Sequence, residues 1–245
     1  MVQRITIDAD QQHEGFLFLR TDQTHYLRRV LRLSSGDRFI AQDGQGRRWL
    51  AALSDEPNQA QVVETIVAPV TALAVPPLRL AAALPKGNSF DQVVRQATEL
   101  GVTHIYPLLS DRTLLNPSNN KLSRWQRIAQ EASEQSERIT VPKIFPVADF
   151  REFVVQPDWQ GVRYICATRQ NSPHLLSKIQ STLLLVDSPD VTLLIGPEGG
   201  WAPTEITVAT ENGYEIVSLG SAILRAVTAS VTALSLVAAA RELLI

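Results

Sequence analysis

Short hydrophobic runs separated by polar residues fill the first 70 positions, which predicts a small β-rich unit. Asp43-Gly44-Gln45-Gly46 lies between two of these runs and is typical of a hairpin turn. Strands of this length and spacing suit a small barrel. The expected strands are Arg4–Ile7, Phe16–Leu19, Arg38–Ala41, Trp49–Leu53 and Gln61–Val67.

One helix interrupts this unit, from about Gln23 to Leu33, with Asp22 or Thr24 expected as its N-cap. Its apolar residues fall at i, i+3 and i+4, so we expect that face to point into the barrel core. These residues are Leu27, Val30 and Leu31.

From residue 78 the pattern changes to alternating strands and helices, which predicts a mostly parallel sheet. The final helix is apolar on nearly every side, so it is either central or part of a subunit interface, and we favour the interface. The expected strands are Leu78–Leu84, Val102–Leu108, Arg163–Ala167, Val191–Ile195 and Glu215–Leu219. The expected helices are Ser89–Leu100, Lys121–Glu137, one beginning at Pro203, and Val227–Leu244.

Two glycine-containing loops follow consecutive strands of this sheet, at Gly196-Pro197-Glu198-Gly199-Gly200 and at Leu219-Gly220. In a parallel sheet they line the same edge, and glycine lets a ligand approach the backbone closely. The spacing is not that of a dinucleotide loop, there is no phosphate-cradling Lys-Ser or Lys-Thr, and Glu198 would repel a pyrophosphate. Ordinary tight turns are the alternative.

Composition adds little for the chain as a whole: 245 residues, 44% hydrophobic, 20% charged and a net charge of -2 describe an ordinary soluble globular protein. Residues 28–48 hold six arginines against two acids, which makes either a solvated face or a phosphate-contacting surface. The single Cys166 excludes an internal disulfide and is expected to be a buried strand residue. The four histidines lack metal-ligand spacing, and no run is apolar enough to span a membrane, so we expect a cytoplasmic protein.

The two glycine loops, with Ile223-Leu224-Arg225, resemble the cofactor end of the SPOUT methyltransferases. Over its whole length the chain resembles more closely the RsmE family, the 16S ribosomal RNA uridine-N3 methyltransferases. Several linked motifs in the same order carry this resemblance. They are His25 to Arg32, Leu84 to Gly87, Gln96 to Gly101, Arg124 to Ile128, and Glu134 to Arg138.

The resemblance implies a PUA-like RNA-binding β-barrel over residues 1–70 and a linker over 71–77. It implies a trefoil-knotted α/β SPOUT domain over 78–245, although threaded chains are rare enough that general rules alone favour an unknotted sheet. It also implies S-adenosylmethionine as cofactor, 16S rRNA or the small ribosomal subunit as substrate, and a homodimer whose sites borrow from the partner.

The same resemblance supplies two sets of binding residues. For the cofactor, backbone contacts come from the two loops, and the apolar side chains before Arg225 pack on adenine. This set is Leu194, Ile195, Gly196, Pro197, Glu198, Gly199, Gly200, Leu219, Gly220, Ile223, Leu224, Arg225 and Ala167. The RNA-binding set is Arg4, His25, Arg28, Arg29, Arg32, Arg47 and Arg48.

The chemistry requires N3 of uridine to lose its proton, so a base must accept it or a cation must stabilise the resulting anion. Glu99 and Glu134 are the candidate bases, and Arg138, Lys86 and Arg225 are the candidate cations. Arg138 is the first choice because it belongs to the family-like Glu-Gln-x-x-Arg group. For each of them, a structural salt bridge is the alternative.

Two positions depart from the family pattern. Ala226-Val227-Thr228 stands where the family usually has Thr-Glu-Thr, and Ala202 occupies a helix cap that is usually serine or threonine. The first departure keeps open the alternative of a non-catalytic RNA-binding assembly factor. A methyltransferase acting at another RNA site or atom is a second alternative, because the sequence does not define the target atom. The second removes a cap contribution of about 1 kcal/mol.

Overall fold

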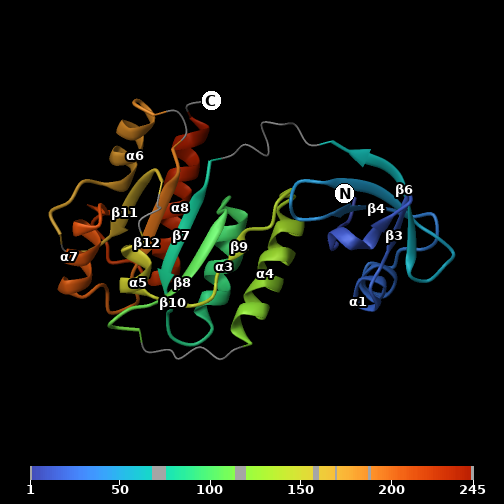
Figure 1. Ribbon diagram of the computed structural model, residues 1–245, viewed down its shortest axis with the longest axis horizontal. Coiled ribbons are helices and arrows are strands. Elements are labelled where there is room, and N and C mark those ends of the chain that lie inside the picture. Colours follow the sequence, from blue (N-terminus) through green and yellow to red (C-terminus); the bar gives the residue numbers. More distant parts are fainter. Residues whose placement is uncertain are drawn as a thin grey trace. The chain divides into compact units, whose positions relative to one another are not determined.

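The computed structural model of the chain describes residues 2–67, 76–113, 120–156, 160–168, 170–186 and 189–243. Two compact units result, each shown in Figure 1. The first comprises Met1–Ala74 and Ser133–Val141, and the second comprises Val75–Ala132 and Pro142–Ile245. Most of the expected linker, residues 71–75, lies outside the described residues.

Within the described residues, the first unit is a six-stranded sheet in the order β1-β4-β5-β6-β3-β2. β1 runs parallel to β4, and the other pairs are antiparallel. The five predicted strands are confirmed, and β2 is an additional short strand. The bounds are β1 Arg4–Thr6, β2 Gln12–His13, β3 Phe16–Phe18, β4 Arg38–Gln42, β5 Arg48–Leu53 and β6 Gln59–Ile66.

Alternation along these strands buries one face of the sheet. Its core includes Leu17, Phe39, Ala51 and Ala60, all without exposed surface. Their strand neighbours point the other way, as the period of two requires. The inner face is closed by the short helical segment that follows β3, whose Leu27 joins the core.

That helical segment differs from the prediction. α1 spans Thr21–His25 and continues as a π-helical turn over Tyr26–Val30. The expected caps are wrong, because Arg20 is the N-cap and its N–H donates to the Gln23 side chain at 2.8 Å. Val30 is also wrong as a core residue, being 57% exposed. The wider turn, with its i to i+5 bonds, breaks the 3.6-residue spacing on which that assignment rested.

Within the part of the chain that the structure describes, the second unit is a parallel sheet of seven strands: the five predicted ones and two short strands, β9 and β10, that were not predicted. The strand order is β10-β8-β7-β12-β11-β13, with β9 also paired to β8. The strands are β7 Leu78–Ala83, β8 His104–Leu109, β9 Lys143–Ile144, β10 Ala148–Asp149, β11 Val162–Cys166, β12 Val191–Ile195 and β13 Glu215–Val217. The helices are α3 Ser89–Glu99, α4 Lys121–Gln135, α5 Phe150–Val154, α6 Leu175–Leu183, α7 Pro203–Glu211 and α8 Ala226–Glu242.

Helices cover both faces of this sheet. α5 and α7 pack on the face that carries Leu194, while α8 packs on β7 and β12 beside α3 and α6. All five residues of β12 are therefore buried, as its continuous apolar run indicates. After β13, at one edge of the sheet, the chain returns to its middle to form α8 (Figure 1). In the described segments no helix is long and apolar enough to cross a membrane.

Candidate cofactor site

A cavity of about 380 Å³ opens at the carboxyl ends of β11, β12 and β13. Three loops surround it, one following each strand, and the first turn of α8 closes one side. This placement matches the edge of the sheet that the sequence predicts for ligand binding. The lining residues are Arg112, Cys166, Ala167, Thr168, Gln170, Ile195 to Trp201, Pro203, Ile206, Ser218, Leu219, Gly220, Ala222, Ile223, Leu224, Ala226 and Ala229.

The indole of Trp201 fixes the first two of these loops together. Its Nε1 donates to the carbonyl oxygen of Cys166 at 3.2 Å. A Cβ atom on Gly196 would lie 3.2 Å from the indole ring, closer than ordinary van der Waals contact. Packing inside the loop therefore favours glycine at position 196, because a larger residue would have to displace the indole ring.

The carboxylate of Glu198 anchors the same loop to the segment that follows β7. Its Oε1 accepts the backbone N–H of Lys86 at 3.1 Å. Lys86 thus lies at the cavity's edge of the sheet, and its side chain is exposed. Glu198 therefore anchors the loop through this hydrogen bond.

Two residues that the sequence interpretation missed complete the support of the loop. Arg112, in the segment after β8, donates from Nη1 to the carbonyl oxygen of Gly199 at 2.6 Å. Glu205 is fully buried and accepts the N–H groups of Ala202 at 2.7 Å and Asp111 at 2.9 Å. Glu205 thereby satisfies the N-cap backbone of α7 although alanine offers no capping side chain.

Cys166 ends β11 at the cavity wall and is a free thiol. Burial raises the pKa of the Cys166 thiol to about 12. The thiol is therefore neutral at neutral pH, which fits the expected structural residue and not a nucleophile.

Nearly all of the residues predicted for the cofactor line this cavity. Leu194 does not, because its side chain is buried against α5 and α7. Arg225 does not line it either; it is the exposed N-cap residue of α8, directly after Leu224. The sequence places Glu205 as an acid in the first turn of the helix that begins at Pro203, but it does not indicate the contact with Asp111. No signal in the sequence singled out Arg112.

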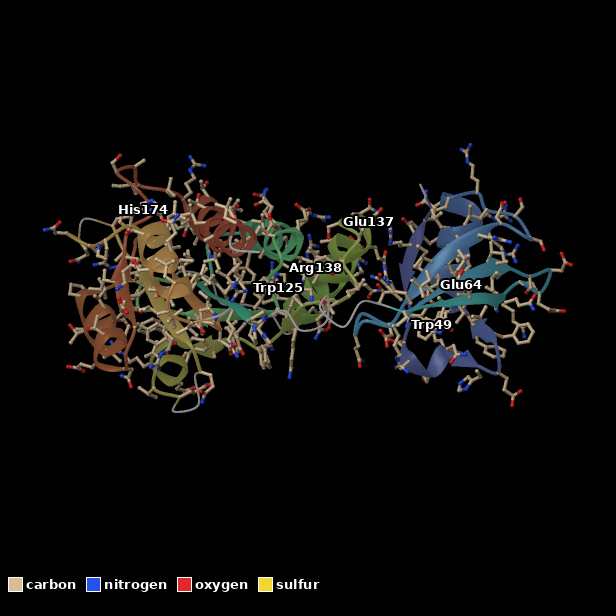
Figure 2. All side chains as sticks on the ribbon, turned by 90° about the horizontal axis from the view of Figure 1, so that it is seen from above. Trp49, Glu64, Trp125, Glu137, Arg138 and His174 are labelled. Atoms are coloured by element: carbon tan, nitrogen blue, oxygen red, sulfur yellow. The ribbon has the colours of Figure 1, made fainter. Side chains whose placement is uncertain are left out.

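The candidate catalytic residues are divided between the two units of the chain. Glu99 is exposed at the end of α3, toward the amino ends of the strands and away from the cavity. Glu134 and Arg138 belong to the first unit, where the Glu134 carboxylate accepts the N–H of Thr6 at 2.6 Å (Figure 2 labels Arg138). Burial lowers the pKa of Arg138 to about 10, so its guanidinium is still charged at neutral pH. Within the second unit, Lys86 and Arg225 lie beside the cavity.

The predicted RNA-binding residues divide into two groups. Arg4 pairs with Glu137 at 2.6 Å, and Arg47 pairs with Asp43 at 2.6 Å. The Arg28 guanidinium donates to the backbone carbonyl of Ser54 at 2.7 Å and is likewise held by the barrel. Arg48 is half-buried in β5, and the exposed members for which no ion pair or hydrogen bond is described are His25, Arg29 and Arg32. No cluster of metal-binding side chains occurs among the described residues.

Comparison with known proteins decides the family. The RNA methyltransferase domain family matches residues 73–238, and the RNA methyltransferase PUA domain family matches residues 19–65. Over 99% of its length the chain is 44% identical to the ribosomal RNA small subunit methyltransferase E of Synechocystis sp., covering 79% of that protein. The chain belongs to the ribosomal RNA small subunit methyltransferase E family. The Bacillus subtilis member is 30% identical, with 98% of this chain and 96% of that protein covered.

Solved structures of the family share the fold. The Neisseria gonorrhoeae ribosomal RNA small subunit methyltransferase E, bound to S-adenosyl methionine, is 26% identical with a TM-score of 0.82 over 96% of each chain. The methyltransferase Lpg2936 of Legionella pneumophila, in complex with the same cofactor, is 26% identical with a TM-score of 0.85 over 98% of each chain. The expected SPOUT-type α/β domain and PUA-like N-terminal unit are thereby confirmed.

Proposed function

We propose that the protein transfers the methyl group of S-adenosylmethionine to N3 of a uridine in 16S rRNA, on the small ribosomal subunit. One observation carries this proposal: the glycine-lined cavity lies at the carboxyl edge of the sheet in a chain of the methyltransferase E family. The names of the relatives give the substrate class, and the two solved relatives hold this cofactor. The target atom follows from the resemblance between the chain and the uridine-N3 enzymes.

The residues present fit the cofactor. A cavity of about 380 Å³ falls within the range of small-molecule sites. Ile223 lines it and is 65% exposed, an unusual state for a large apolar side chain that an adenine ring would cover. Gly196 and Gly199 leave the backbone of the first loop open to polar groups of the ligand. We assign adenine packing to Ile223 and Leu224.

Gly199→Val tests this assignment. The added side chain would meet Arg112, whose Cδ lies 3.3 Å from the position of a Cβ atom, and would occupy the cavity. Equilibrium dialysis with labelled cofactor should show binding lost while the circular dichroism spectrum is kept. Thr207→Val, exposed on α7 and outside the cavity, is the control. Undiminished binding by Gly199→Val would refute the assignment.

When bound, the cofactor supplies a methyl group activated on a sulfonium. The chain must hold an unpaired uridine against it, exclude water and stabilise the anion that N3 forms when it loses its proton. Arg138 remains our first candidate for the stabilising cation, Lys86 and Arg225 are the others, and Glu134 or Glu99 is the proposed base. The position of Lys86 beside the cavity supports a role for it within one chain.

Two substitutions separate these candidates. Arg138→Ala should keep cofactor binding and lose turnover, and unchanged turnover would remove Arg138 from the mechanism. Lys86→Ala, measured in the same assay, should lower turnover if the cation comes from the cavity's own chain. Arg127→Ala changes an exposed arginine of α4 and is the matched control.

A homodimer is part of this proposal. Ala226, Ser230, Ala233, Leu234, Val237 and Ala240 of α8 are buried within the chain. Val231 and Leu236 of the same helix remain partly exposed. A second copy would cover this apolar flank, and the cavity lies against the start of the same helix. Sedimentation of the purified protein should give a dimer, and Val231→Glu should give a monomer. We place the dimer in the cytoplasm.

The deciding experiment is methyl transfer from labelled S-adenosylmethionine to small ribosomal subunits from cells lacking the family enzyme, followed by nucleoside mass spectrometry. N3-methyluridine in 16S rRNA is the expected product. A different methylated nucleoside would move the target to another atom or RNA. If neither cofactor binding nor transfer occurs, the protein is an RNA-binding assembly factor, the alternative that Ala226-Val227-Thr228 in place of Thr-Glu-Thr keeps open.

A further inference from the structure

The outward face of the sheet in the first unit presents one continuous row of side chains. The strand register pairs His13 with Phe16, Phe16 with Gln61, Gln61 with Ala52, and Ala52 with Arg38. Directly paired residues of antiparallel strands point to the same side of a sheet. The neighbours of these residues along the strands, Leu17, Ala60, Ala51 and Phe39, are buried on the opposite face. The row therefore faces away from the core.

Two large aromatic rings stand on this outward face. Phe16 is 38% exposed, and Phe18, two residues along the same strand, is 44% exposed. The His13 ring lies 6.2 Å from that of Phe18. The core of the unit, on the inner face, does not use these rings. Exposed aromatic side chains on a sheet are the surface on which unpaired bases stack in single-stranded RNA and DNA binding.

The polar members of the row complement a nucleotide. Gln61, beside Phe16, has an amide that can both donate to and accept from a base edge. Arg38 is exposed, and its side chain makes no hydrogen bond or ion pair within the described part of the chain. It differs in this from Arg4 and Arg47, whose guanidinium groups are held by carboxylates. The row itself contains no carboxylate.

The length of the row suits a segment of RNA longer than one nucleotide. Four spacings between neighbouring strands separate His13 from Arg38, about 19 Å in all. The nearest acid on β6 is Glu64, paired with Leu50 in a separate row and labelled in Figure 2. Phosphates are therefore favoured at the Arg38 end of the row.

We propose that this row, together with Phe18, binds an unpaired segment of RNA. Bases stack on Phe16 and Phe18, Gln61 hydrogen-bonds a base edge, and Arg38 contacts a phosphate. The proposal rests on the proposed function only in taking RNA as the ligand. It adds a recognition surface to the substrate-binding part of the protein, formed by residues outside the arginine set that the sequence indicates.

The test measures binding of the full-length protein to a short fluorescein-labelled single-stranded RNA, and to a duplex of equal length, by fluorescence anisotropy. The double variant Phe16→Ala, Phe18→Ala should weaken single-strand binding by about 10-fold or more, the size expected for lost stacking. Duplex binding should not change. Phe16→Trp should retain the affinity. Val63→Ala, 47% exposed on β6 but outside the row, is the control.

Charge is tested separately. Arg38→Gln should reduce the slope of log affinity against log salt by about 0.7, as expected when a single-strand phosphate contact is lost. Glu64→Gln should leave affinity unchanged or raise it. The proposal is wrong if the double phenylalanine variant binds single-stranded RNA as tightly as the parent protein. It is also wrong if Val63→Ala loses as much single-strand affinity as the double variant, because bases then do not stack on these two rings. If the variant instead lowers self-association, the face is an interface between copies.

Methyl transfer by the same preparations distinguishes the two proposals. Ring-dependent RNA binding without any methyl transfer would leave this surface standing and overturn the proposed function. Normal methyl transfer, together with RNA binding that does not depend on Phe16 and Phe18, would overturn this surface and leave the proposed function standing. Because neither ring belongs to the core on the inner face, the double variant should keep the circular dichroism spectrum of the folded protein, which is recorded for each preparation.

Discussion

Replacing Glu205 tests whether one buried carboxylate holds two loops of the cavity. Its oxygens accept the N–H groups of Ala202 and Asp111, at 2.7 and 2.9 Å, and the residue is fully buried. Hydrogen bonds to a charged group contribute about 1.5–3 kcal/mol each. Glu205→Ala should therefore lower the free energy of unfolding by about 3–6 kcal/mol. Glu205→Gln keeps one acceptor and should lose about half as much.

The assay is urea unfolding followed by tryptophan fluorescence, since Trp125 and Trp201 are both buried in the second unit. Glu211→Ala, at the exposed end of α7, is the control and should change stability by no more than about 0.5 kcal/mol. Cofactor affinity should fall in parallel, because Asp111 precedes the arginine that holds the carbonyl of Gly199. If Glu205→Ala lowers the free energy of unfolding by less than about 1 kcal/mol, the reasoning is refuted. The N–H groups of Ala202 and Asp111 must then find other acceptors in the variant.

Three further predictions concern single positions. Gly44→Ala should destabilise the first unit by about 1–3 kcal/mol in thermal unfolding, because Gly44 has a φ of +68° and a Cβ there would lie 2.9 Å from Val141 Cγ2. Cys166, with its pKa raised to about 12, should hold about 1,000-fold less thiolate at pH 8 than a thiol of pKa 9.0, and should therefore react more slowly with a disulfide reagent. Burial and nearby cations lower the pKa of His104, so stability should fall as pH drops below 6.5 and His104→Gln should flatten that dependence.

The sign of the His104 prediction follows from proton binding. A histidine whose pKa is lowered by folding binds fewer protons in the native state than in the unfolded chain at pH values below 6.5. Acid therefore favours unfolding, and above pH 6.5 the group is neutral in both states and contributes no slope. A steeper loss of stability in His104→Gln than in the parent protein would contradict this account.

Elements with continuous or alternating apolar patterns were predictable from the sequence. β12 is an apolar run bounded by a glycine. Helices cover both faces of the sheet, so all five of its residues are buried, and a continuous apolar run predicts such a strand. The loops that follow β12 and β13 were predictable for the same reason, since parallel strands end at one edge. The positions of these two loops in the sequence therefore predict which edge of the sheet carries the cofactor cavity.

Features set by a few local hydrogen bonds were not predictable. The Leu31 N–H bonds to the Tyr26 carbonyl, five residues earlier, and this one wide turn moves Val30 to the surface. The short helices α5 and α6 have too few turns for a clear period. Arg112 joins the cavity through a contact between residues 87 positions apart, which no local pattern encodes.

The segment after α4 shows why a boundary in sequence differs from one in space. Most of α4 belongs to the second unit, yet Ser133–Val141, which includes the last residues of that helix, belongs to the first. Glu134 binds the Thr6 N–H, and the Val141 N–H donates to the carbonyl oxygen of Gly44 at 2.8 Å. A fragment ending at residue 70 would leave both of these first-unit groups without their partners. The Glu-Gln-x-x-Arg group thus has a structural task in addition to any catalytic one. Loss of turnover in Arg138→Ala is therefore evidence for catalysis only if Val141→Ala, which weakens the packing of the same segment against Gly44, leaves turnover intact.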